Sequence, residues 1–215
     1  SRALIQKDTL ENNEIPIGVH GELSRVGTTN ERGNTYISNV ILEHQTDSVT
    51  AIGRDLIGTL GGTVPGGYTQ NVLIPESDLT LDREDTLRIA PGSIIKFADR
   101  RDFNVNGKLL SEGASDSKIV FTSLKDDTFG GNTNNDTTGI QPSSGDWNGI
   151  AIRGTDTDSS VISNTIVRYA RTNLSTDRSD VLIDSSTFSF ALFNGIFVGG
   201  GSFPTIRNSD IHNNS

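Results

Sequence analysis

The 215-residue chain contains no cysteine and no methionine. Without cysteine it can form neither a disulfide nor a thiolate metal site, so packing and hydrogen bonds must supply its stability. Because the chain begins at Ser1 and no methionine follows, we predict that it is a processed or excised segment of a longer polypeptide.

Positive charge and long apolar runs are also scarce. The chain has 18 Lys and Arg residues against 27 Asp and Glu residues, for a formal net charge of −9. Such a chain repels a phosphate backbone, so nucleic acid is not an expected partner. The longest apolar runs, such as GIFVGGG and GSIIKF, are far shorter than the roughly 20 residues that span a bilayer, and no transmembrane segment is predicted.

Helix signals are few, and apolar residues recur instead in short alternating bursts that predict strands. Gly, Asn, Asp and Ser turns separate these bursts. The chain is therefore expected to be all-β, with strands at LTL 79–81, LRIA 87–90, IIKF 94–97, FNVNGKL 103–109, IVFTS 119–123, GIAIRG 149–154, TIVRY 165–169 and GIFVGG 195–200.

A repeated pattern distinguishes a solenoid from a sandwich. In the last third, pairs of apolar residues recur with steps of 22 (183 − 161) and 23 (206 − 183) residues. A period of about 22 residues with two or three short strands is typical of one coil of a parallel β-solenoid, in which each coil pairs with the next. The pairs are Val161/Ile166, Ile183/Phe188 and Ile206/Ile211.

The stretch LRIAPGSIIKFADRRDFNVNGKLLSEGASDSKIVFTS, with GDWNGIAIRG after an Asp-, Asn- and Gly-rich segment, has a recognisable order of motifs. It resembles the bacterial right-handed parallel β-helix repeat proteins of large secreted and cell-surface polypeptides. In that family I-x-P-G-x-x-(V/I)-K-F precedes (L/V)-x-(V/I)-x-G-x-L-x-A-x-G, (I/V)-x-F-T-S and G-D-W-x-G-I. The match is close over residues 79–154. The resemblance implies a right-handed parallel β-helix and a bacterial extracellular or cell-surface location.

Apolar residues of these strands are expected to form a stacked core: Ile89, Ile94, Ile95, Phe97, Phe103, Val105, Leu109, Ile119 and Phe121. Gly92, Gly107 and Gly113 are expected at corners that require positive φ or leave no room for a side chain. Several asparagines fall within or just after apolar pairs, where an amide can bond to the equivalent residue one coil away. They are Asn12, Asn39, Asn164, Asn208 and Asn213.

The two ends of the chain repeat each other. With an offset of 201 (206 − 5), Ile5 meets Ile206, and the same offset pairs Leu10 with Ile211 and Asn12–Asn13 with Asn213–Asn214. We therefore predict that residues 1–215 form a single β-helix segment, about one unit of a tandem repeat of roughly 200 residues. Loop excursions are expected at 53–72 and 124–147. Unpaired sheet edges at the two ends would allow self-association or stacking of neighbouring repeats end to end.

The segment 125–147, KDDTFGGNTNNDTTGIQPSSGDW, is too long for a simple corner. Its alternating oxygen side chains are similar to those of a calcium loop, but Thr137 stands where such a loop has glycine and no bidentate glutamate follows. A structural polar loop and a Ca²⁺ site therefore both stay open. The candidate ligands are Asp126, Asp127, Asn132, Asn134, Asp136 and Asp146.

Trp147 is the only tryptophan of the chain and directly follows this loop. Its broad apolar face is suited either to stacking on a sugar ring or to holding the excursion against the solenoid wall. Both interpretations stay open from the sequence.

Enzymes built on β-helices cleave or epimerise polysaccharides with clustered carboxylates and a base. The charged residues of this chain form no such motif, so no catalytic residue is predicted. The charged residues considered are Arg153, Asp156, Asp158, Arg168, Asp180, Asp184, Asp210 and His212. We expect a non-catalytic, extracellular structural or adhesive scaffold, with Ca²⁺ as the only candidate cofactor. The alternative is a carbohydrate-active enzyme or a polysaccharide-binding module.

Overall fold

The computed structural model describes residues 49–52, 58–60, 62–63, 69–70, 72–75, 77–134, 140–154 and 159–215, with the backbone alone before residue 72. The predictions for residues 1–48 lie outside these residues, including those for Asn12, Asn39 and the N-terminal copy of the repeat. Among the residues described, no helix occurs, and so none that could cross a membrane.

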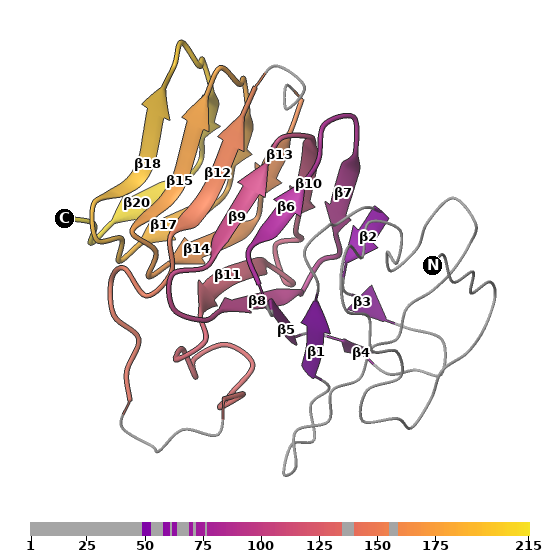
Figure 1. The fold of residues 1–215 in the computed structure, drawn as a ribbon, viewed down its shortest axis with the longest axis vertical. Helices are drawn as coiled ribbons and strands as arrows, with labels where there is room; N and C mark the ends of the chain where they lie inside the picture. Colours follow the sequence, from indigo (N-terminus) through magenta and orange to yellow (C-terminus); the bar gives the residue numbers. More distant parts are fainter. Residues whose placement is uncertain are drawn as a thin grey trace.

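Three parallel sheets form the walls of a solenoid (Figure 1). Sheet 1 has seven strands, in the order β1 (Val49–Ile52), β5 (Val72–Pro75), β8 (Ile94–Phe97), β11 (Ile119–Ser123), β14 (Thr165–Arg168), β17 (Thr187–Ser189) and β20 (Asp210–His212). Sheet 2 consists of β2 (Gly58–Leu60), β7 (Thr86–Ile89), β10 (Lys108–Glu112), β13 (Val161–Ser163), β16 (Leu182–Asp184) and β19 (Thr205–Arg207). Sheet 3 consists of β6 (Leu79–Leu81), β9 (Asp102–Val105), β12 (Gly149–Arg153), β15 (Thr172–Asp177) and β18 (Asn194–Gly199).

The chain visits sheets 2, 1 and 3 in turn, so that β7, β8 and β9 form one coil and β10, β11 and β12 form the next. It makes about six turns of about 23 residues each. The predicted all-β parallel β-solenoid is therefore confirmed. Among the described strands, every pairing within the three sheets is parallel, and only the short β3 (Gly62–Thr63) and β4 (Thr69–Gln70) pair antiparallel.

The segment 53–72, expected to be an excursion, includes both kinds of pairing. Strands β3 and β4 form the small antiparallel pair, whereas β2 joins the wall of the solenoid by pairing with β7. The other residues between Ile52 and Val72 lie outside the described part of the chain.

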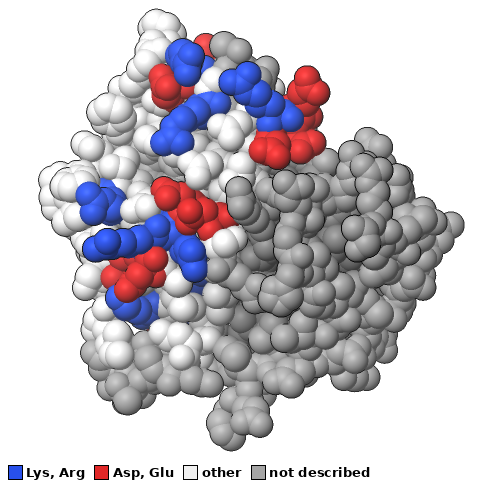
Figure 2. Space-filling model, viewed as in Figure 1, with Lys and Arg blue, Asp and Glu red and all other residues white. Residues whose placement is uncertain are grey.

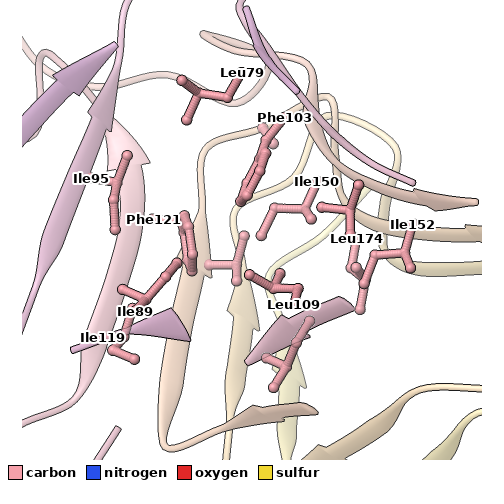
Figure 3. Close-up of a cluster of buried hydrophobic side chains, with 14 of the residues drawn as sticks. Leu79, Ile89, Ile95, Phe103, Leu109, Ile119, Phe121, Ile150, Ile152 and Leu174 are labelled. Carbon is pink, nitrogen blue, oxygen red and sulfur yellow. The ribbon is translucent and has the colours of Figure 1, made fainter. Parts of the chain in front are cut away.

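Inward side chains form columns that run along the solenoid, and Figure 3 shows part of the resulting core. In sheet 1 the column runs Leu73, Ile95, Phe121, Val167, Phe188 and Ile211. In sheet 3 it runs Leu79, Phe103, Ile150, Leu174 and Ile196. Of the nine predicted core residues, eight are at most 1% exposed, whereas Ile94 points outward and is only partly buried.

Two predicted glycine corners have no room for a side chain. A Cβ on Gly107 would lie 2.2 Å from the carbonyl oxygen of Asp82, and one on Gly113 would lie 2.4 Å from that of Asn164. In both cases the neighbour is a backbone carbonyl of an adjacent coil, at a turn between two strands, and not the movable end of a flexible side chain.

Of the three apolar pairs predicted for the last third, the first, Val161/Ile166, is wrong by one residue. The buried residues are Ile162 and Val167, each 21 residues before its partner (183 − 162 and 188 − 167), while Val161 and Ile166 point outward. Because side chains alternate along a strand, a shift of one residue exchanges the inward and outward faces.

The predicted asparagine bond to the equivalent residue one coil away is present at Asn164, which reaches Gly113, but it does not continue through the later coils. Asn164 and Asn208 occupy left-handed corners with φ of 45° and 51°, but Ser185 holds the equivalent corner between them. Asn164 donates to the carbonyl oxygen of Gly113, and Asn208 donates to Asp184.

Hydroxyl groups link these coils instead. The amide of Thr165 donates to Ser186 Oγ, and that of Ser186 donates to Ser209 Oγ, at 3.2 Å in each case. In each case a serine hydroxyl of one coil accepts a hydrogen bond from a backbone amide of the preceding coil.

Candidate functional site

The excursion between β11 and β12 lies below the sheets in Figure 1, and its described part covers outward residues of sheet 1. At Gly130 an added Cβ would lie 2.5 Å from Val72 Cγ2 and 3.7 Å from Lys96 Cε. The backbone of the excursion therefore lies directly on the outer faces of β5 and β8.

This cover buries a lysine. Lys96 points out of the solenoid from β8, yet it is 0% exposed, and its Nζ donates to the carbonyl oxygen of Gly131 at 2.5 Å. A buried ammonium group without polar partners would cost several kcal/mol, so the backbone oxygen supplied by the excursion compensates for this desolvation.

A second buried charge joins the excursion to the next coil. Asp126 is 0% exposed and accepts from Thr122 Oγ1 at 2.5 Å and from the amide of Thr128 at 3.1 Å. The Arg168 guanidinium from β14 completes the site, with Nη2 donating to Oδ1 and Nε lying 3.0 Å from Oδ2. Both carboxylate oxygens are thus engaged in a two-point ion pair.

Aromatic rings cover the exposed side of this ion pair. The guanidinium of Arg168 lies 5.0 Å from the ring centroid of Phe129 in the excursion and 4.7 Å from that of Tyr169. Tyr169 stacks in turn on Phe190 of the next coil, at 5.2 Å between centroids. The cluster therefore ties the excursion to two further coils.

The two ends of the excursion are held together by Lys125 and Asp146, whose Nζ and Oδ1 lie 3.0 Å apart. Asp146 Oδ2 also accepts from Ser123 Oγ and from the amide of Ser143. The hydrogen bond to Asp146 raises the pKa of Lys125 above 10.5, so the ammonium is fully charged at neutral pH.

Trp147 ends the excursion inside the core. It is 0% exposed, stacks on Phe97 with ring centroids 4.3 Å apart, and donates from Nε1 to the carbonyl oxygen of Arg168 at 2.9 Å. A sugar ring has no access to a face of this indole. The contacts correspond to the second interpretation, in which the tryptophan holds the excursion against the wall.

The candidate calcium ligands are separated into different networks. Asp126 pairs with Arg168 and Asp146 with Lys125, while Asp127 is exposed. Asn132 and Asn134 lie partly buried in the excursion, and Asp136 is outside the described residues. Among the residues that are described, no group of three or more Asp, Glu, His or Cys side chains could hold a metal ion. The two interpretations of this segment, a structural polar loop and a Ca²⁺ site, both stay open.

Two of the scattered charged residues also have structural partners. Asp184 accepts from Asn208 at 2.9 Å and from Arg207 Nε at 3.0 Å, and the bond from Asn208 is the main cause of its lowered pKa. A carboxyl group with a lowered pKa is poorly suited to act as a general acid near neutral pH. Arg153 donates to Asn104 Oδ1 at 2.9 Å.

His212 and Asp210 are brought together at the last coil, with Nε2 and Oδ2 3.8 Å apart. Both side chains are partly or largely exposed, and the imidazole also meets the ring of Phe190 edge to face. Asp156 and Asp158 lie outside the described residues.

Comparisons with protein-family models, with curated proteins and with solved structures found no match for this chain.

Proposed function

We propose that the chain is a non-catalytic scaffold segment whose C-terminal end accepts a further parallel coil from a second copy of the same kind of segment. The observation that carries this proposal is the state of the inward columns at the last coil. Ile206 and Ile211 continue the columns of sheets 2 and 1, yet they are 41% and 46% exposed. Val198, the last inward residue of its column in sheet 3, is 45% exposed.

Backbone groups at this end support the same proposal. Strands β18, β19 and β20 are the last strands of their sheets. The amides of Thr205 and Asp210 donate to the preceding coil. Because successive amides of a strand point in opposite directions, the amides of Ile206 and Ile211 point toward the open end. Such edges pair readily with another strand, and a parallel coil offers the matching geometry in all three sheets.

The sequence repeat supports a second copy as the occupant. Residues 205–214 match residues 4–13 in register, so the two ends of a segment are related by the period of the array. A contact between unlike ends is heterologous and propagates into a filament. A bacterial extracellular or cell-surface setting belongs to this proposal and rests on the resemblance of residues 79–154.

Surface charge fits a role in assembly better than polyanion binding on the visible face. In Figure 2 the acidic and basic side chains of the described residues lie beside one another, without a large area of one sign. The net charge of −9 further opposes association with acidic polymers.

Sedimentation velocity over a range of protein concentrations tests the proposal. The unsubstituted chain should form species larger than a dimer as concentration rises, and Ile206→Lys should prevent this growth beyond a dimer by placing a charge in the contact. Thr205→Lys is the matched control because Thr205 is exposed on the outward face of the same strand. A strict monomer at all concentrations would overturn the proposal.

Incubation with acidic polysaccharides tests the proposal that the chain is not a catalyst. No new reducing or unsaturated ends should appear. Turnover that Asp184→Asn or Asp210→Asn abolishes, in protein that remains folded, would show that the chain is an enzyme instead.

A further inference from the structure

Three exposed phenylalanines lie along the course of the chain at β18, the last strand of sheet 3, and we call them the phenylalanine rim. Phe193, Phe197 and Phe203 are 48%, 52% and 78% exposed. They lie immediately before β18, within it and after it, so they follow one edge of sheet 3. Exposed apolar clusters of this kind commonly mark a contact surface.

The residues directly below the rim are polar. In the preceding coil, the positions equivalent to Phe193, Phe197 and Phe203 are occupied by Arg171, Ser175 and Asp180. One coil earlier still, Ala151 occupies the position equivalent to Ser175. The outer face of sheet 3 therefore changes from small and polar side chains to phenylalanine only at its last coil.

A coil stacked on the end of the solenoid would not cover this rim. Side chains alternate along β18, so Ile196 and Val198 point inward and Phe197 points outward. End-to-end stacking would bury the inward residues, while the phenylalanine side chains would stay on the lateral surface. The rim therefore calls for a separate partner, on grounds independent of the proposed end contact.

We infer that the rim binds the same rim of a second copy in a two-fold symmetric, side-by-side dimer. Opposite charges stand at its two ends: the guanidinium of Arg171 lies 5.2 Å from the ring of Phe193, and Asp180 Oδ1 accepts from the amide of Phe203 at 2.7 Å. If the two β18 strands face each other in antiparallel directions, Arg171 of each copy stands opposite Asp180 of the other.

Two further charged residues lie near the rim. Asp177 and Arg178 also lie near the Phe203 end, but they pair with each other at 3.6 Å. A parallel orientation of the two strands would place like charges together, so charge complementarity selects the antiparallel one. The contact is isologous and closes at two copies, whereas end stacking propagates.

The two associations can be separated in an Ile206→Lys background, which removes end stacking. Sedimentation equilibrium should then show a monomer–dimer equilibrium. Replacing Phe193, Phe197 and Phe203 by Asn, Ser and Ser should weaken the dimer by roughly tenfold or more, since buried aromatic residues dominate such contacts. Ile140→Ser is the matched control, because Ile140 is a 43% exposed apolar residue in the excursion.

A charge exchange tests the orientation. Arg171→Asp should weaken the dimer, and adding Asp180→Arg should restore it. A folded Ile206→Lys chain that stays monomeric, a dimer that survives the triple substitution, or binding of the rim to lipid vesicles without dimer formation would each overturn the inference. Growth of the unsubstituted chain beyond a dimer reports separately on end stacking. If Ile206→Lys fails to fold, Ile211→Lys provides the same background.

Discussion

Ile183 and Ile206 occupy the same inward column of sheet 2, one coil apart, but Ile183 is 0% exposed and Ile206 is 41% exposed. Sheet 1 shows the same change between Phe188 and Ile211, from 0% to 46%. The local sequence and strand geometry are alike in the two coils. A coil of this solenoid therefore does not bury its own apolar residues, because the next coil completes the burial.

The same comparison holds for charged groups. Arg168 and Asp126, in the interior, are 15% and 0% exposed, whereas Arg207 and Asp184, which join the last two coils, are 58% and 21% exposed. The interior pair is enclosed by the excursion and by aromatic rings, while the terminal pair faces solvent. The stability of the fold therefore depends more on each member of the interior ion pair than on each member of the terminal pair.

The largest expected effect comes from a charge in the column of sheet 2. Ile183→Asp should cost several kcal/mol and abolish cooperative unfolding, because it buries an unpaired carboxylate. Ile206→Asp in the dilute monomer should cost roughly 1 kcal/mol or less. Circular dichroism and thermal unfolding measure both. Equal losses would show that the last coil is as closed as the interior.

Removing one partner of the interior ion pair is the next largest effect. Arg168→Met should lower the free energy of unfolding by about 3 kcal/mol, because it leaves the buried Asp126 carboxylate without its cation. Urea denaturation measures the loss, and Arg168→Met combined with Asp126→Leu should recover much of it. Arg207→Met at the last coil is the control and should have little effect. A comparable loss in the control would contradict the account.

A smaller effect concerns pH at the last coil. Asp184 has a pKa below its ordinary value of 3.8, chiefly because the Asn208 amide bonds to the carboxylate. A lowered pKa in the folded state means that the contribution is present above pH 3.8 and is lost as the pH falls through the folded pKa. The β16–β19 contact should therefore loosen in acid below this pH. NMR shifts of Asn208 should report this change, and Asp184→Asn should abolish the pH dependence.

The smallest expected effect is that of calcium. Because Arg168 and Lys125 already neutralise Asp126 and Asp146, millimolar Ca²⁺ should leave the melting temperature close to its value in EDTA. A bound ion at 100 times its dissociation constant would add about 2.7 kcal/mol. A gain of that size, removed by Asp146→Ala, would show that the excursion is a metal site.

Much of the wall could be predicted from the sequence because its signals are local. The alternating apolar residues of 87–123 place Ile95, Phe97 and Phe121 inside, and the corner glycines mark close backbone approaches. The register at Val161–Ile162 and Ile166–Val167 could not be predicted, since both members of each doublet are apolar. Alternation alone does not show which member points inward.

The contacts of the excursion were out of reach for a different reason. Arg168 and Asp126 are 42 residues apart, and the length of the intervening loop hides the coil period that brings them together. Lys96 lies between the inward residues Ile95 and Phe97, but nothing local indicates that the excursion returns to cover it. Buried charges that depend on a long loop require the fold to be known first.

Hydrogen exchange at the open end tests the central claim most directly. In dilute solution the amides of Ile206 and Ile211 should exchange quickly, whereas amides of the interior strands β13 and β14 should be strongly protected. As the protein concentration rises, a second copy should pair with β19 and β20, and exchange at Ile206 and Ile211 should become slow while the interior stays unchanged. Fast exchange at both residues at every concentration would contradict the account.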